Sequence, residues 1–149
     1  MAKKIKVLHM FRELEIGGIQ SFIGNVYNNI DQSLIQFDFL VSSIGILDDE
    51  YKKRGSKIYY IPYITKVGPI KYKQNLINFF TNHKEYNIIH IHFDKFSGLI
   101  AETAKLCGIK TIICHSHTIS NETNFIGKIY KNYLQHKIVP NATNLFACS

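Results

Sequence analysis

Short apolar runs alternate with segments of helical spacing along the whole chain. The runs, each of a length that suits one buried strand, are 5–10, 37–42, 57–62, 86–93, 110–115 and 144–149. Between them apolar residues recur every three or four positions, most clearly over 19–30. Shorter helices are expected at 48–54, from Pro69, from a cap at Ser97 to Cys107, and over 125–136. This order predicts an α/β fold with a Rossmann-like, doubly wound parallel sheet.

The chain length is that of one domain, and no repeat or linker divides it. We therefore predict a single domain over 1–149 of the 149 residues. The last apolar run ends at the chain terminus, where a strand of this kind normally leads into another helix. We expect the domain to be truncated at its C-terminal end and to belong to a longer protein.

Composition adds a basic charge and a reducing environment. The formal net charge is +7, which favours an anionic partner such as a phosphate-bearing ligand, a nucleic acid or a membrane surface. Three cysteines without metal-ligand spacing suit a reducing compartment. No apolar run reaches the ~20 residues of a membrane span. These features predict a cytoplasmic protein, possibly peripheral on the inner face of the cell membrane.

Two consecutive glycines, Gly17 and Gly18, stand between the first strand and the first helix. Glycine allows positive φ and lets a ligand approach the backbone. The amides and dipole of the following helix form a site suited to phosphate. Neither the dinucleotide fingerprint nor a P-loop is present. A flexible turn is the other explanation of this pair.

Histidines gather where the fourth and fifth strands end. "HIHFD" places His90 and His92 on one side of a strand, with Asp94 following, and "HSHT" contains His115 and His117. If the first, fourth and fifth strands are neighbours, these groups line one crevice with the glycines. His115 and His117 can donate hydrogen bonds to a sugar hydroxyl or phosphate oxygen. A metal-dependent hydrolase is the alternative, with His90 as a core residue otherwise.

Lys66, Lys71 and Lys73 are interleaved with aromatic and aliphatic residues, including Tyr72 and Ile64. Cations beside exposed aromatic side chains suit an anionic membrane surface. They also suit single-stranded nucleic acid, and a solvated loop and helix would have the same composition.

The ordered set "GGIQSFIGNVYNNID", "FDFLVSS", "IIHIHF", "SGLIAETAKLCGIK", "TIICHSHT" and "NLFACS" resembles the N-terminal domain of GT-B glycosyltransferases. More narrowly, it resembles the retaining, family-four group that builds capsular and other surface polysaccharides. The resemblance implies that this acceptor-side domain faces its own C-terminal domain, which mainly holds the nucleotide-sugar donor.

The resemblance also implies residue roles. Gly17 and Gly18 match the loop that approaches the donor diphosphate, and His115 matches the histidine that contacts the transferred sugar, with His117 as an alternative. His92 and Asp94 are acceptor-side candidates, and Lys66, Lys71 and Lys73 are membrane-surface candidates. The expected partners are a nucleotide-sugar donor, a glycan or lipid-linked acceptor and an anionic membrane, without nucleic acid. No cofactor and no metal are expected.

Two other function classes stay open at this point. One is a metal-dependent hydrolase built on the HxHxD and HSH histidines. The other is a stand-alone basic module that binds a ligand.

Overall fold

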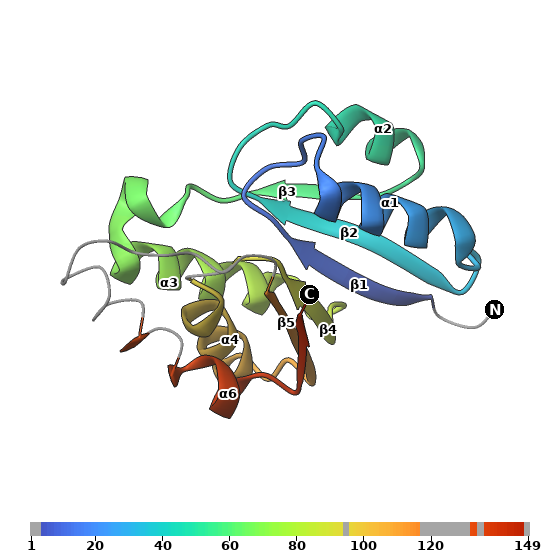
Figure 1. The fold of residues 1–149 in the computed structure, drawn as a ribbon. Coiled ribbons are helices and arrows are strands. Elements are labelled where there is room, and N and C mark those ends of the chain that lie inside the picture. Colours follow the sequence, from blue (N-terminus) through green and yellow to red (C-terminus); the bar gives the residue numbers. More distant parts are fainter. Residues whose placement is uncertain (1–3, 94–95, 117–131, 134–135, 148–149) are drawn as a thin grey trace.

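Six parallel strands form one sheet in the computed structural model, which describes residues 4–93, 96–116, 132–133 and 136–147. The strand order is β3-β2-β1-β4-β5-β6, and every neighbouring pair is parallel (Figure 1). The strands are β1 (Ile5–Met10), β2 (Ile35–Val41), β3 (Ile58–Tyr60), β4 (Ile88–Ile91), β5 (Thr111–Ser116) and β6 (Asn144–Ala147). This is the predicted Rossmann-like, doubly wound order, so the expected fold class is confirmed.

Helices cover both faces of the sheet. They are α1 (Gly18–Asn29), α2 (Asp48–Lys53), α3 (Ile64–Asn82), α4 (Ser97–Leu106) and α6 (Ile138–Asn141). Figure 1 shows α1 and α2 on one face, over β1 to β3, and α3, α4 and α6 on the other. The chain changes face at α3, after β3 on one edge of the sheet, and then builds β4, β5 and β6 outward from the centre.

Each face has its own apolar cluster, because successive strand residues point to opposite sides. Leu8 and Met10 pack with α3 and α4. Phe37 and Phe39 pack with α1 and α2. The strands therefore sort their side chains between two cores, as expected for a parallel sheet covered on both faces.

A carboxylate is buried in the middle of β2. Asp38 is fully buried and accepts hydrogen bonds from the Tyr86 hydroxyl, the Gln36 side-chain amide and the Lys57 backbone N–H, each at 2.7 Å. These donors replace the water that the carboxylate loses on burial. Asp38 thus ties β2 to the segment before β3 and to the residue pair that precedes β4.

Helix boundaries differ from the sequence prediction in two places. The segment ahead of Pro69 is already helical from Ile64, and Gly68, with φ of +80°, marks the kink that separates this first turn from the rest of α3. Ser97 is the first helical residue and not a cap, since Phe96 occupies the N-cap position without a side-chain hydrogen bond. Most of the helix predicted over 125–136 lies outside the described residues.

Candidate functional site

The carboxyl ends of β1, β4 and β5 lie side by side at one edge of the sheet. β1 pairs with β4, and β4 pairs with β5, which fulfils the condition under which the predicted site residues share a crevice. The connections from β1 and β4 diverge, because β1 leads to β2 on one side and β4 leads to β5 on the other. Ligands bind at such a switch point in open parallel sheets.

The glycine pair opens α1 at this switch point. Gly17 is the N-cap of α1 and Gly18 its first residue, and no described side chain caps the helix. The first helical bond runs from the Ser21 N–H to the Gly17 carbonyl at 2.9 Å. The amides ahead of it belong to the part of a helix that lacks intrahelical acceptors, and the helix dipole is positive there. This geometry suits an anion.

Positive φ is not the reason for either glycine. Gly17 is extended, with φ of −166°, and Gly18 is absent from the positive-φ residues. A Cβ at Gly18 would meet no atom within 4 Å, and a Cβ at Gly17 would meet only the mobile end of Gln20. The described protein therefore leaves open space beside Gly18. The assignment of that space to a diphosphate stays a prediction.

The loop between β1 and α1 is fixed from behind by the loop that follows β2. A Cβ at Gly45 would lie 2.3 Å from the Leu14 carbonyl oxygen, so the two backbones are in direct contact. The Leu47 N–H donates to that same oxygen at 3.0 Å. The Ser42 and Ser43 amides both donate to the Arg12 carbonyl. The segment that leads to the glycine pair is thus held by backbone contacts.

Four histidines lie together on the α1 face of the sheet. His9 of β1 is in register with His90 of β4, and His115 follows on β5. His9 Nδ1 lies 3.2 Å from His92 Nε2, and His90 Nε2 lies 3.2 Å from His115 Nδ1. All four side chains are buried. The cluster therefore joins three strands at the edge where the site was predicted.

His115 connects the histidines to the glycine-led helix. Its ring lies edge-on to Phe22 of α1, with centroids 6.5 Å apart, and edge-on to Phe146 of β6, at 5.8 Å. Burial lowers the pKa of His115. A neutral imidazole is therefore favoured at pH 7, and it keeps one N–H to donate.

His92 faces the cluster more than the outside. Its ring stacks on Phe11, with centroids 4.3 Å apart and an angle of 6°, and its side chain is 9% exposed as part of the residue. Its backbone N–H donates to the Met10 carbonyl at 3.0 Å. The acceptor role of His92 stays a prediction. Asp94 and His117 lie outside the described residues.

Two of the three candidate lysines are open to solvent. Lys66 and Lys71 are exposed, as is Ile70 at 87%. Lys73 Nζ instead lies 3.5 Å from Glu102 Oε2 of α4. The expectation that Tyr72 and Ile64 accompany them at the surface is wrong, because both are core residues under α3. No described helix has the length and apolar character needed to cross a membrane.

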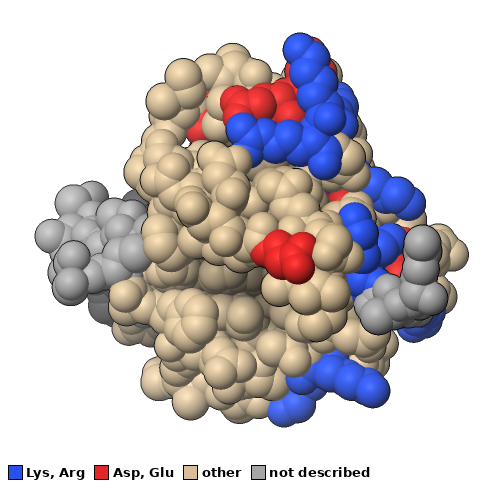
Figure 2. Space-filling model, turned by 90° about the vertical axis from the view of Figure 1, so that its right-hand side faces the viewer, with Lys and Arg blue, Asp and Glu red and all other residues tan. Residues whose placement is uncertain are grey.

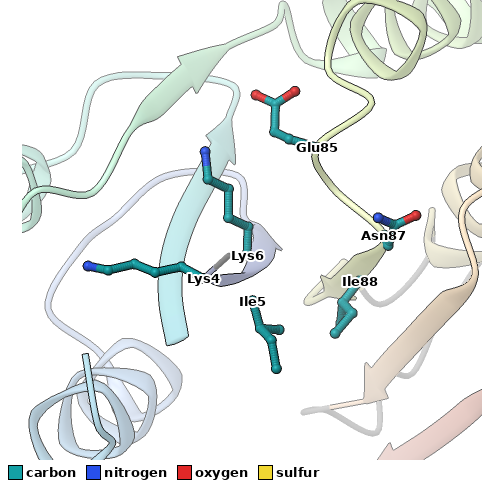
Figure 3. A pocket seen from close by; sticks show the side chains of 6 residues that line it. All are labelled: Lys4, Ile5, Lys6, Glu85, Asn87 and Ile88. Atoms are coloured by element: carbon teal, nitrogen blue, oxygen red, sulfur yellow. The ribbon is translucent and has the colours of Figure 1, made fainter. Parts of the chain in front are cut away.

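The opposite edge of the sheet offers a less distinctive surface. A pocket of about 320 Å³ lies between the starts of β1 and β4, lined by Lys4, Ile5, Lys6, Glu85, Asn87 and Ile88 (Figure 3). Figure 2, which views the molecule from the side where β1 begins, shows Lys and Arg in separate groups, some beside Asp and Glu. On this face the net positive charge does not form one continuous surface, and the pocket holds no buried polar group.

Comparison with known proteins supports the predicted fold and class. The chain is 33% identical over 147 residues to "Putative glycosyltransferase EpsF" of Bacillus subtilis (strain 168), a match that covers 96% of this chain. The chain is an N-terminal domain of the GT-B glycosyltransferase type. The crystal structure of Acinetobacter baumannii MurG matches 98% of the domain with a TM-score of 0.65 and 14% identity, a likeness of fold. No protein-family model matches the sequence.

The matched proteins are longer than this domain. The chain spans 38% of the Bacillus protein and 41% of the MurG chain. Neither match supports the metal-dependent hydrolase that the HxHxD pattern left open. The glycosyltransferase class therefore applies to the domain, and the activity of a whole protein is argued below.

Sequence reasoning missed His9. It stands alone in "VLHMF", and only the pairing of β1 with β4 places it opposite His90. Its spacing from the inward-facing Leu8 and Met10 gave the one available signal, since His9 must point to the other face. That face is where the glycosyltransferase domain collects its imidazoles.

Proposed function

We propose that this domain is the acceptor side of an enzyme that transfers a sugar from a nucleotide-sugar donor, with retention of configuration. The acceptor is a glycan or a lipid-linked glycan of surface polysaccharide biosynthesis, and a C-terminal domain supplies most donor contacts. One observation carries the proposal: Phe22 links His115 to α1, the helix that begins without a side-chain cap at Gly18. A phosphate site and a sugar-binding imidazole can therefore share one ligand.

The residues divide the work by charge. The amides at the start of α1 bind the donor diphosphate, and the open space at Gly18 admits it. As the bond from the anomeric carbon to the diphosphate breaks, these amides stabilise the negative charge that develops on the leaving oxygen. The acceptor oxygen bonds to the same face of that carbon, and its proton passes to the leaving phosphate. His115 donates a hydrogen bond to the transferred sugar.

Substitution of His115 in the enzyme that contains this domain tests the proposal. His115→Ala should lower turnover by about 10²-fold, the typical cost of losing one hydrogen bond to a reacting group. His90→Ala should cost much less, because His90 acts only through its 3.2 Å hydrogen bond to His115. His136→Ala, on the exposed surface, is the matched control and should be neutral. Release of nucleoside diphosphate with acceptor present is the measurement, at equal folding by circular dichroism.

A His115→Ala enzyme within a few-fold of wild type would contradict this role. Activity lost equally in His90→Ala would make the histidine cluster a structural unit instead. For the 149-residue chain alone we expect folding without sugar transfer, since most donor contacts are proposed to lie elsewhere. Turnover by this chain would contradict that expectation.

We also propose that the domain works at the cytoplasmic face of an anionic membrane. Lys66, Ile70 and Lys71 project from the kinked start of α3. Basic residues near an anionic surface contribute about 1 kcal/mol each, so these two lysines add about 2 kcal/mol. Lys73 adds less, because Glu102 already compensates its charge.

Vesicle cosedimentation tests the membrane contact. Lys66→Glu with Lys71→Glu should abolish the preference for anionic over neutral vesicles. Lys53→Glu with Lys57→Glu makes the same change in net charge at exposed lysines of the α2 region, and should leave most of the preference intact. Moderate salt should weaken binding. Equal loss in both double variants would leave only a general basic surface.

A further inference from the structure

The α1 face of the sheet holds three histidines whose nitrogen atoms converge. One ring nitrogen from each of His9, His90 and His92 lies within 4.8 Å of the other two. The three side chains are at most 9% exposed. They come from two neighbouring strands and the residue after β4, so the sheet itself brings them together.

The closest pair already has the spacing of two ligands of one ion. His9 Nδ1 and His92 Nε2 are 3.2 Å apart. Two nitrogens bound to Zn²⁺ at about 2.0–2.1 Å in tetrahedral geometry lie about 3.3 Å apart. The widest pair, at 4.8 Å, would have to close by about 1.5 Å, which side-chain rotation can supply.

A second observation concerns His9 itself. Its Nε2 atom is buried and has no hydrogen-bond partner among the described residues. Buried polar atoms in native proteins are generally satisfied, so an unsatisfied one calls for a missing partner such as an ion. The ring is packed on Phe37, with centroids 4.3 Å apart, which leaves little room for it to turn toward solvent.

We infer that His9, His90 and His92 form a site for a divalent transition metal ion, with Zn²⁺ as the representative. Imidazole nitrogen suits Zn²⁺, Cu²⁺ and Ni²⁺. The site differs from the hydrolase that the HxHxD pattern suggested, because its third ligand is His9 and it needs no carboxylate. It also replaces the expectation that the domain binds no metal.

The ion would act on His115 through His90. If His90 binds the metal through Nδ1, its Nε2–H donates to His115 Nδ1 across the observed 3.2 Å. Ligating histidines usually donate their other N–H in this way. His115 is then fixed with its N–H on Nε2, as a hydrogen-bond donor. This consequence rests on the proposed function, whereas the metal site does not.

Zinc titration of the metal-stripped 149-residue chain tests the site. We expect one equivalent to bind, measured by calorimetry in chelator-free buffer. His92→Phe keeps the stacking on Phe11 and His9→Phe keeps the packing on Phe37, and each should weaken binding at least tenfold. His136→Ala removes an exposed histidine outside the cluster and should bind as wild type does. Circular dichroism checks that each variant folds.

X-ray absorption of the zinc-loaded wild type makes the test independent of the variants. The inference expects at least three imidazole nitrogens at about 2.0 Å and no sulfur. Sulfur ligation, the absence of stoichiometric binding, or unchanged affinity in both phenylalanine variants would overturn it. The histidines would then be two hydrogen-bonded pairs that pack the sheet. Loss of metal binding would leave the transferase proposal untouched, because the two are measured separately.

Discussion

Replacing Gly18 with alanine separates what the fold needs from what the proposed ligand needs. The added Cβ meets no atom within 4 Å, and Gly18 does not use positive φ. Glycine in a helix is about 0.5–1 kcal/mol less favourable than alanine. Because Gly18 is the first residue of α1, we take the lower value and expect Gly18→Ala to stabilise the domain by about 0.5 kcal/mol.

For a domain of this size 1 kcal/mol shifts Tm by about 2–4 °C, so Gly18→Ala should raise Tm by about 1–2 °C. Gly45→Ala is the contrasting change. Its Cβ would overlap the Leu14 carbonyl oxygen at 2.3 Å, and the loops would have to separate. Overpacking of this kind costs about 1–3 kcal/mol, which lowers Tm by about 2–10 °C. Differential scanning calorimetry of both variants gives the two signs.

The functional half of the prediction has the opposite sign. In the enzyme that contains this domain, Gly18→Ala should raise the Kd for the nucleotide-sugar about tenfold, equivalent to 1.4 kcal/mol. The methyl group would occupy the space proposed for the diphosphate. A lower Tm for Gly18→Ala would refute the open space. A higher Tm with unchanged donor affinity would refute the diphosphate assignment and leave Gly18 as an ordinary turn residue.

Three further predictions concern the fold around the site. Asp38→Ala should cost at least about 3 kcal/mol in urea unfolding, since it leaves three donors without their acceptor, whereas the exposed Asp49→Ala should stay within about 0.5 kcal/mol. The hydrogen bond from Lys137 lowers the pKa of Glu102, so this ion pair stabilises the domain above the unfolded pKa and the benefit fades as pH falls through and below it. Glu102→Gln should therefore be less stable than wild type at pH 7, by under 1 kcal/mol, and equal to it near pH 3. Burial raises the pKa of the Cys114 thiol to about 12, so iodoacetamide at pH 8 should label Cys114 only after unfolding, and labelling of the native chain would contradict this.

The strand and helix pattern could be predicted because each element is periodic over its own length. The prediction for 5–10 coincides with β1, and that for 19–30 differs from α1 by one residue at each end. Gly55 and Gly108 were expected at helix ends, and both have the positive φ of that position. These signals are local, so the rest of the fold does not change them.

The start of α3 and the histidine cluster could not be predicted for the opposite reason. Pro69 suits a helix start, but the turn from Ile64 is held by burial of that side chain against distant elements. His9 is placed by the register of β1 against β4, whose residues are separated from it by four other elements. Sequence periodicity assigns a residue to a face of its own strand and says nothing about which strand lies beside it.

The same register explains why the site can be polar without weakening the sheet. On β1, β4 and β5 the residues that alternate with the histidines, such as Leu8, Ile89 and Ile112, are fully or almost fully buried under α3 and α4. Apolar burial on that face supplies the stability of these central strands. The α1 face near their carboxyl ends is therefore free to carry imidazoles, which pair with one another instead of with water. A site built on strands fixed from the opposite side is rigid, and rigidity is what a hydrogen-bond donor needs to favour a transition state over a substrate.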